Sequence, residues 1–171
     1  MQTCPVRCNL FGSRLSKDGL SPTGAKLEAI RDAPQPDDAK LLKSFVGLVM
    51  YYSKFLPCHS TVLAPLNELT RKGVRWRRTK VEQDVFQKAK DILINSETVV
   101  HYDDSLPLCL SCAASQYGAG AVLTHKIDGI FRPIAFASVT LKQAQQIYSQ
   151  LDKEAFSVIF GLKRFHQFLA G

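Results

Sequence analysis

The 171-residue sequence has no long hydrophobic run, no excess of acidic residues and no even set of cysteines. No stretch approaches the ~18 consecutive apolar residues of a membrane span. Residues 1–11 also lack the apolar run of a signal peptide, so we expect an intracellular protein that does not bind membranes. The five cysteines are odd in number and scattered, which argues against the disulfide framework of a small secreted protein.

The composition is that of a soluble globular chain, with 46% hydrophobic and 22% charged residues. The 22 Lys and Arg residues outnumber the 15 Asp and Glu residues, which gives a formal net charge of +7. Clustered basic side chains neutralise phosphates and release counterions, so this charge favours an anionic partner such as a nucleic acid. Composition alone leaves a basic surface without such a partner as the alternative.

Helical spacing dominates the first 95 or so residues. Residues 1–20 are expected to form a strand or hairpin that ends at the Asp18-Gly19 turn signal, and Ser21-Pro22 is expected to open a helix that carries Leu27 and Ile30. Three further helices follow from apolar residues at i, i+3 and i+4. They are a helix from Asp37 or Asp38 (Leu41, Phe45, Leu48, Val49, Tyr52, Phe55), a helix over 60–72 (Val62, Leu63, Leu66, Leu69) and a helix that begins with a capping box at Thr79 (Val85, Phe86, Ala89, Ile92, Leu93).

The pattern changes after Asn95. Short apolar runs at 106–112, 119–125 and 131–137, with an Asp128-Gly129 hairpin signal, predict three consecutive antiparallel strands. A last helix, from about Ser149 to Leu169, is expected to cover one side of this sheet with an apolar face made of Leu151, Ala155, Val158, Ile159, Leu162 and Phe165. The sequence therefore predicts an α+β fold, a small helical unit followed by a three-stranded sheet and a helix.

Several segments, in register, resemble the Pol polyprotein of gypsy-type LTR retrotransposons. They are Leu10-Phe11-Gly12 with 16–20, 43–48 (KSFVGL), 51–57 (YYSKFLP), 64–66 (APL), 69–73 (LTRKG), Trp76 with Phe86, 114–123 (ASQYGAGAVL), 132–138 (RPIAFAS), Tyr148-Ser149 and Lys153-Glu154. The resemblance implies a remnant of the reverse transcriptase palm and thumb entry at 1–20, a helical thumb or connection unit at 21–100, and the N-terminal half of an RNase H-like domain at 101–171. Because the sequence stops directly after an amphipathic helix, we expect this last domain to be truncated.

RNase H chemistry uses two Mg²⁺ ions about 3.5–4 Å apart, held mainly by carboxylates. The resemblance places the first family Asp at Ala113, where a methyl group cannot bind Mg²⁺, and a second family carboxylate at Glu154. The remaining family carboxylates would come from segments beyond residue 171. Asp103 and Asp104 lie roughly 30 Å from Ala113 on an extended strand, and Asp152 faces about 200° away from Glu154 on a helix, so neither substitutes. We therefore predict a catalytically inactive chain without a bound metal ion.

Other candidate sites have structural explanations. Tyr102-Asp103-Asp104 resembles the Tyr-x-Asp-Asp of polymerase active sites, but its place before the first strand favours a polar turn. Cys109-x-x-Cys112 has the spacing of half a zinc site, yet residues three apart on a strand point to opposite faces, which favours incidental thiols. Cys4-x₃-Cys8 has no second pair at suitable spacing.

The four histidines are expected to have structural or surface roles, because they are isolated from one another and from any Ser or Cys in a recognisable catalytic arrangement. They are His59, His101, His125 and His166.

The candidate nucleic-acid-binding segment is the decapeptide 71–80, which carries no acid and six basic residues: Arg71, Lys72, Arg75, Arg77, Arg78 and Lys80. A basic loop around an aromatic residue suits phosphate contact, and the family's thumb and connection follow the template-primer duplex, so RNA–DNA hybrid is the expected partner. A solvated interhelical loop is the alternative. Two further functions stay open: a retained host protein-interaction or structural module, and a part of an active Pol polyprotein whose other segments complete the polymerase and RNase H sites.

Overall fold

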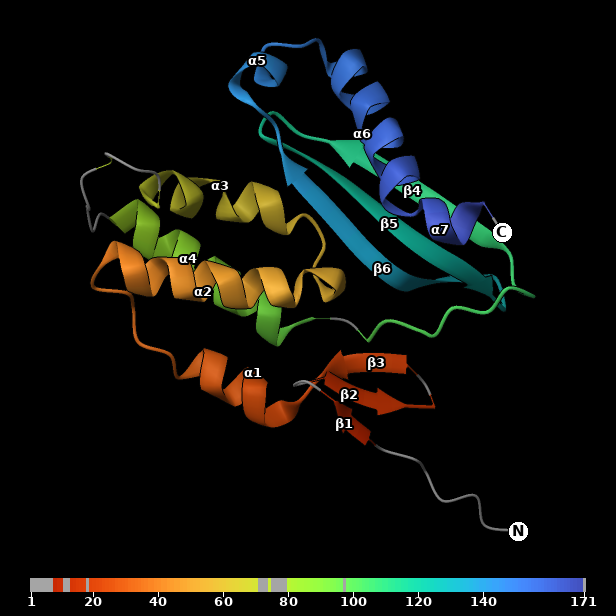
Figure 1. Ribbon diagram of the computed structural model, residues 1–171, viewed down its shortest axis with the longest axis horizontal. Coiled ribbons are helices and arrows are strands. Elements are labelled where there is room, and N and C mark those ends of the chain that lie inside the picture. The colour runs from red at the N-terminus through yellow and green to blue at the C-terminus, as the bar shows by residue number, and fades with distance from the viewer. Residues whose placement is uncertain are drawn as a thin grey trace.

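A small antiparallel sheet, a helical unit and a second antiparallel sheet follow one another along the chain in the computed structural model (Figure 1), which describes residues 8–10, 13–17, 19–70, 74, 80–96 and 98–170. This mixture of helices and antiparallel strands confirms the predicted α+β fold class. In chain order the elements are β1 (Cys8–Leu10), β2 (Ser13–Ser16), β3 (Gly19–Pro22), α1 (Gly24–Arg31), α2 (Ala39–Tyr51), the 3₁₀ helix η1 (Ser53–Phe55), α3 (His59–Leu69), α4 (Lys80–Ile94), β4 (Leu108–Ala114), β5 (Gly118–Ile127), β6 (Ile130–Thr140), α5 (Gln143–Gln146), α6 (Gln150–Arg164) and α7 (His166–Leu169).

The N-terminal strands form a three-stranded sheet in the order β1-β2-β3. The prediction that Ser21-Pro22 opens a helix is wrong, because both residues belong to β3, where Pro22 pairs with Ser13. The strand is held in place by Val99, which exchanges two backbone hydrogen bonds with Leu20, at 2.7 and 3.0 Å. The chain therefore stays extended through Pro22, and α1 begins only at Gly24.

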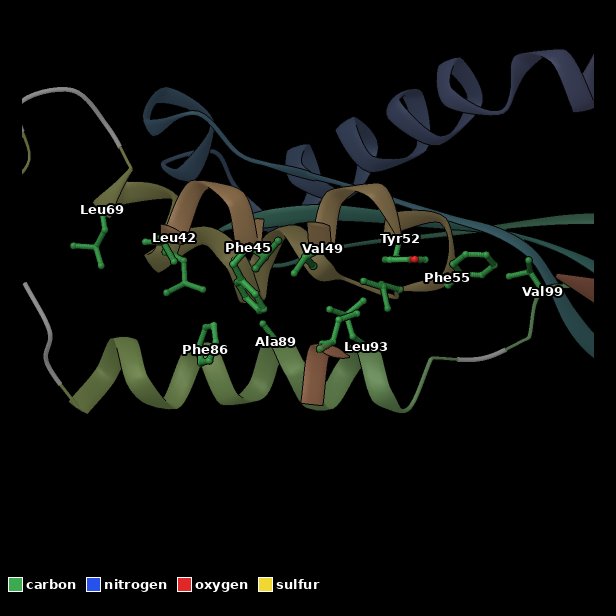
Figure 2. Close-up of a cluster of buried hydrophobic side chains, with 14 residues drawn as sticks. Leu42, Phe45, Val49, Tyr52, Phe55, Leu69, Phe86, Ala89, Leu93 and Val99 are labelled. Atoms are coloured by element: carbon green, nitrogen blue, oxygen red, sulfur yellow. The ribbon is translucent and has the colours of Figure 1, made fainter. Parts of the chain in front are cut away.

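The helical unit buries one continuous apolar cluster between α2, α3 and α4. Figure 2 shows side chains of α2 directed toward those of α4, and the rings of Phe45 and Phe86 have centroids 4.4 Å apart. Asp38 caps α2 as expected, since its carboxylate accepts the backbone N–H of Leu41 at 2.7 Å. The placement of Leu41 on the buried stripe is wrong: it is 52% exposed, and Leu42 is buried in its place. The predicted capping residue of α4, Thr79, lies outside the described residues.

The second sheet has the order β4-β5-β6, with all pairs antiparallel. Its β5–β6 hairpin turns through Asp128 and Gly129, both in the left-handed region with φ of 51° and 79°. Asp-Gly is a preferred pair for this turn because it tolerates positive φ at both positions. The three predicted antiparallel strands and their hairpin are confirmed, with ends that differ by a few residues.

Helix α6 covers one face of this sheet, but with the opposite side from the one predicted. The residues of α6 that are buried are Lys153, Ser157 and Gly161. The large aliphatic residues instead form an exposed row, which we call the α6 stripe: Leu151 (76% exposed), Val158 (47%), Ile159 (53%) and Leu162 (48%), with the exposed Ala155 between them. The predicted buried face is therefore wrong for these five residues. Phe165 is buried, and the helix breaks there before α7 begins.

A close approach between α6 and the sheet explains this orientation. A Cβ atom added at Gly161 would lie 2.7 Å from Cys112 Sγ and 3.1 Å from the Cβ of Ala121. Because side chains already project from β4 and β5 at this point, the helix fits against them where Gly161 has no side chain. The neighbouring Gly120 faces the other side of the sheet, where Cys58 Sγ would lie 3.5 Å from its added Cβ.

The helical unit joins this other face of the sheet through a buried polar cluster. Ser138 of β6 accepts the backbone N–H of Ser60 at 2.9 Å and donates to the Ser60 hydroxyl at 2.8 Å, so a strand residue caps the N-terminus of α3. His59 Nδ1 lies 3.2 Å from the Leu56 carbonyl oxygen and 3.1 Å from Ser138 Oγ. His59 therefore has a structural role, as expected, and its partner Ser138 lies 79 residues away in the sequence.

The hydrogen-bond partners of His59 determine which of its ring nitrogens carries the proton. A carbonyl oxygen only accepts, so Nδ1 carries the proton that it donates to Leu56. His59 is 3% exposed, and burial lowers its pKa below the ordinary value of 6.5, against the opposing effect of the Leu56 hydrogen bond. The folded state therefore holds this imidazole in its neutral form more strongly than the unfolded chain does.

Replacement of Gly161 by alanine tests the close packing of α6. We expect Gly161→Ala to lower the free energy of unfolding, because overpacking costs about 1–3 kcal/mol and outweighs the gain in helix propensity of about 1 kcal/mol. The cost should shrink when Cys112→Ala removes the nearest atom. The matched control is Gly47→Ala on α2, where an added Cβ meets nothing within 4 Å and should stabilise the chain. Urea denaturation measures the free energy of unfolding of Gly161→Ala, Cys112→Ala, their double variant and Gly47→Ala. Equal effects of the two glycine substitutions would contradict the packing argument.

The buried His59 predicts a specific loss of stability in mild acid. Its lowered folded pKa means that its contribution is complete above pH 6.5 and is lost as the pH falls below that value, because the unfolded chain then takes up the proton more readily. The difference in free energy of unfolding between the wild type and His59→Gln should therefore narrow from pH 8 to pH 5. The exposed His166→Gln serves as control. A wild-type to His59→Gln difference that stays constant over this range would refute the prediction.

Candidate functional site

Ala113, the predicted position of the first family Asp, lies near the C-terminal end of β4, where it pairs with Gly120 of β5. Its exposed methyl group offers no ligand atom. Successive residues of a strand face opposite sides, so Ala113 faces away from α6, because its neighbour Cys112 packs against Gly161. On that side Ala113 helps to line a small apolar pocket of about 170 Å³ together with Pro57 and Cys58.

Glu154 lies in the first turns of α6 with an exposed side chain. Its Oε1 accepts a hydrogen bond of 3.0 Å from Gln150 Nε2, and the same amide nitrogen donates to the carbonyl oxygen of Ala114, also at 3.0 Å. Gln150 therefore ties the second family position to the residue after Ala113. The sequence analysis did not identify Gln150, although its i, i+4 spacing from Glu154 was a signal for this contact.

The donor atoms near these two positions do not fit a pair of Mg²⁺ ions. The structure brings the two family segments together, but only Glu154 contributes a carboxylate. In the part of the chain that the structure describes, no three His, Cys, Asp or Glu side chains are grouped so as to hold a metal ion. Asp152 is occupied at the start of α6, where it accepts a hydrogen bond from the Ser149 hydroxyl at 2.7 Å.

Tyr102-Asp103-Asp104 forms a polar turn, as predicted. The Asp103 carboxylate accepts the Ser105 hydroxyl at 2.6 Å and the Ser105 backbone N–H at 2.9 Å, and these hydrogen bonds lower the pKa of Asp103. The backbone N–H of Asp103 donates to Nε2 of His125, whose Nδ1 lies 3.2 Å from the Pro107 carbonyl oxygen. Because a carbonyl oxygen only accepts, the proton of His125 lies on Nδ1. Since His125 is also fully buried, its role is structural.

A wider, open pocket of about 620 Å³ adjoins this turn. Its lining includes carboxylates at Asp103 and Asp104 and cations at Lys17 and Arg132. Charges of both signs favour no single class of ligand. His101 also lines this pocket, and its Nε2 donates to the Ser16 carbonyl oxygen at 2.8 Å, which links β2 to the segment that precedes β4.

The described cysteines lack the arrangement of a zinc site. Cys58, Cys109 and Cys112 are free thiols, and burial raises the pKa of Cys112. A raised pKa disfavours the thiolate that zinc binds. Of the N-terminal pair, Cys4 lies outside the described residues and Cys8 belongs to β1.

The predicted basic segment joins α3 to α4. Lys80 is the exposed first residue of α4, and α3 ends at Leu69. The other five basic residues lie outside the described residues: Arg71, Lys72, Arg75, Arg77 and Arg78.

The remaining histidine, His166, is exposed at the start of α7. Among the described residues, no helix has both the length and the apolar character that crossing a bilayer requires.

Comparison with known sequences identifies relatives of both parts of the chain. The family model for the RNase H-like domain found in reverse transcriptase matches residues 78–171, more than half of the chain. The Tf2-3 and Tf2-4 transposon polyproteins of Schizosaccharomyces pombe are each 33% identical over 160 residues, which cover 93% of this chain and 12% of the polyprotein. The chain thus spans about an eighth of the length of these relatives.

Solved structures share the fold. The foamy viral protease-reverse transcriptase in complex with RNA/DNA hybrid matches with a TM-score of 0.83 and 21% identity, over 95% of this chain and 22% of that one. The same viral enzyme, described as dRH and in complex with double-stranded DNA, matches with a TM-score of 0.84 and 22% identity, over 96% of this chain and 29% of that one. The family model and the Tf2 polyproteins confirm the predicted resemblance to retrotransposon Pol. The chain belongs to the family of RNase H-like domains found in reverse transcriptases.

Proposed function

We propose that this chain is a non-cleaving RNase H-like segment of a retrotransposon Pol protein that binds nucleic acid duplexes, RNA–DNA hybrid above all. The observation that carries the proposal is the pair of family positions at the end of β4 and the start of α6. Ala113 supplies a methyl group where the family pattern has an Asp, and Glu154, which Gln150 links to the Ala114 carbonyl oxygen, is the one family carboxylate that the described residues retain.

The absence of cleavage follows from the charge that two-metal catalysis requires. Two divalent cations bring four positive charges to one place, and several carboxylates must offset them. A lone exposed carboxylate, which already accepts a hydrogen bond from Gln150, does not provide that charge. We therefore assign Glu154 the task of anchoring the first turns of α6 through Gln150 and Ala114 rather than the task of holding a metal ion.

Duplex binding is supported by charge and by the related structures. The segment 71–80 holds six basic residues and no acid, which nearly accounts for the net charge of +7. The foamy viral enzymes that share this fold are in complex with RNA/DNA hybrid and with double-stranded DNA. A connection of this charge between two helices suits contact with phosphates rather than with base edges, so we expect binding without sequence preference.

Two other functions remain candidates, each favoured by one observation. The exposed α6 stripe favours a protein-interaction module, which would fold but would lack affinity for hybrid. The length of the polyprotein relatives favours a part of a larger active Pol protein whose other segments complete the catalytic sites.

Cleavage assays test the catalytic part of the proposal. The purified chain should release no product from RNA–DNA hybrid in Mg²⁺ or Mn²⁺, and Ala113→Asp alone should not restore activity, because two carboxylates still fall short of the required set. A known active RNase H serves as positive control, and circular dichroism establishes that the variant is folded. Measurable cleavage by either protein would overturn the assignment.

Salt dependence tests the binding part. Fluorescence anisotropy with labelled hybrid should show an affinity that falls between 50 and 200 mM salt, by up to about a thousandfold if all six basic side chains contact phosphates. The triple variant Arg75→Gln, Arg77→Gln, Arg78→Gln should bind hybrid more weakly. The slope of the logarithm of its binding constant against the logarithm of the salt concentration should be smaller in magnitude, by about one for each phosphate contact removed.

The matched control for this variant removes the same charge from the exposed surface of α1 and α2. It carries Lys26→Gln, Lys40→Gln and Lys43→Gln and should keep the wild-type slope. An affinity for hybrid that does not change between low and physiological salt would contradict duplex binding through phosphates.

A further inference from the structure

The helical unit and the second sheet have separate hydrophobic cores. One cluster of buried side chains joins α1 to α4, and the other joins the sheet to the end of α6. Figure 1 shows the helical unit beside the sheet, on the side of β6. Phe136 of β6 packs against the first cluster, but farther along this strand the contact with the start of α3 is made by His59, Ser60 and Ser138. A boundary with few apolar contacts can open locally while each core stays folded.

The start of α3 depends on this contact for its cap. Cys58, the residue before the helix, makes no side-chain cap, and the Ser138 hydroxyl accepts the backbone N–H of Ser60 instead, at 2.9 Å. The single hydrogen of that hydroxyl goes to the Ser60 hydroxyl at 2.8 Å, so toward His59 Nδ1, 3.1 Å away, it acts as an acceptor. The Nδ1 proton of His59 is therefore shared between Ser138 and the Leu56 carbonyl oxygen.

A second proton on His59 has to bind at Nε2, where none of the described residues forms a hydrogen bond with the ring. The apolar surroundings disfavour a cation there, because nothing replaces its lost hydration. The position of His59 as the first residue of α3 adds to the cost, since the N-terminus of a helix carries partial positive charge. The side chains that face His59 are uncharged on each element packed against it: Val49 of α2, Val62 and Leu63 of α3, Ala89 and Ile92 of α4, and Ser138 of β6.

The charged side chains of the same elements are directed elsewhere. The amine of Lys54 in η1 lies over an aromatic ring, 5.0 Å from its centroid. Lys90 of α4 donates to two carbonyl oxygens at and just after the end of α1, and Asp91 accepts a hydrogen bond from Gln87 of its own helix. The charged residues of α2, α3 and β6 have exposed side chains: Lys40, Lys43, Glu68 and Arg132. No carboxylate among these residues is placed to stabilise a charged His59.

Another part of the boundary is held by backbone hydrogen bonds that do not involve an ionisable side chain. Val99 exchanges two of them with Leu20, and the N–H of Val100 donates to the carbonyl oxygen of Pro133 in β6 at 2.8 Å. Ser138 lies five residues farther along β6, which is about 16 Å on an extended strand. The contact at Ser138 can therefore open while the segment at Val99 and Val100 keeps the helical unit attached to the sheet.

We propose that the contact between the start of α3 and β6 is a proton-operated latch, which neutral His59 holds shut and which opens when His59 takes up a second proton. In the open state the charged ring reaches water, the hydrogen bonds between Ser60 and Ser138 are broken, and Val99 and Val100 act as the pivot. The latch is formed by buried contacts within the chain. It does not depend on duplex binding, and it is tested without nucleic acid.

Amide hydrogen exchange, followed by NMR on the full 171-residue chain, tests the latch. The protection of the Ser60 N–H is the ratio of its intrinsic to its measured exchange rate, which removes the effect of pH on the exchange chemistry itself. This protection should be constant between pH 8 and pH 7. Below pH 6.5 it should fall by up to about tenfold per pH unit, because opening then takes up one proton. The protection of the Leu20 and Val99 N–H groups should stay unchanged, because the pivot stays closed.

Variants separate His59 from the other ionisable groups. His59→Gln should abolish the pH dependence of Ser60 protection, whereas the matched control His166→Gln, at an exposed position, should retain it. Ser138→Ala leaves His59 in place but removes the hydroxyl that caps α3, so it should lower Ser60 protection about fivefold or more even at pH 8. Circular dichroism establishes that each variant is folded, and the wild type and Ser138→Ala still decide the question if His59→Gln does not fold.

Three results would overturn the proposal. The first is a Ser60 protection that does not fall below pH 6.5, or that falls equally in His59→Gln. The second is a loss of protection at Leu20 and Val99 in step with Ser60, which would show general unfolding in place of a local opening. The third is a Ser60 protection that Ser138→Ala leaves unchanged.

Discussion

The close contact between α6 and the second sheet determines the arrangement of the C-terminal half of the chain. Leu110, Cys112 and Ala121 project from β4 and β5 to meet Gly161 of the helix. A helix that lies this close presents Ser157 and Gly161 at the contact, and the large aliphatic side chains of the α6 stripe are left on the outside. The rings of Phe160 and Phe165 pack against the core cluster of this sheet. The same contact sets the start of α6 against the end of β4, where Gln150 reaches the Ala114 carbonyl oxygen. The position of Glu154 and the exposure of the α6 stripe are thus two results of one packing constraint.

Local features of the sequence predicted the fold well. The Asp128-Gly129 turn, the Asp38 cap and the three strands depend on residues close to one another in the chain, and the structure confirms them. The apolar row of the last helix was also correctly recognised as a row. Its partner was misjudged because periodicity shows that a helix has an apolar side without showing what that side meets. The space left by the facing strands decides that question, and it depends on the tertiary structure.

Features that join distant segments escaped prediction. His59 and Ser138 are separated by 79 residues, and no local pattern indicates that they meet. The start of α1 was misplaced for the same reason, because the backbone pairing of Leu20 with Val99 keeps β3 extended. The candidate site was easier to locate, since Ala113 and Glu154 follow from the family pattern alone. The bounds of the three predicted units of the chain stay predictions, as do the roles of Ala113 and Glu154.

The bridge made by Gln150 bears on how this family's sequences are interpreted. One amide nitrogen has two hydrogens, and here both are used, by Ala114 and by Glu154. A glutamate at this position therefore contributes to fastening a helix to a strand whether or not a metal ion is ever present. Loss of nuclease function would remove one reason to keep this glutamate and leave the other in force. This packing role explains an intact glutamate as well as metal binding would, so Glu154 does not by itself indicate nuclease activity.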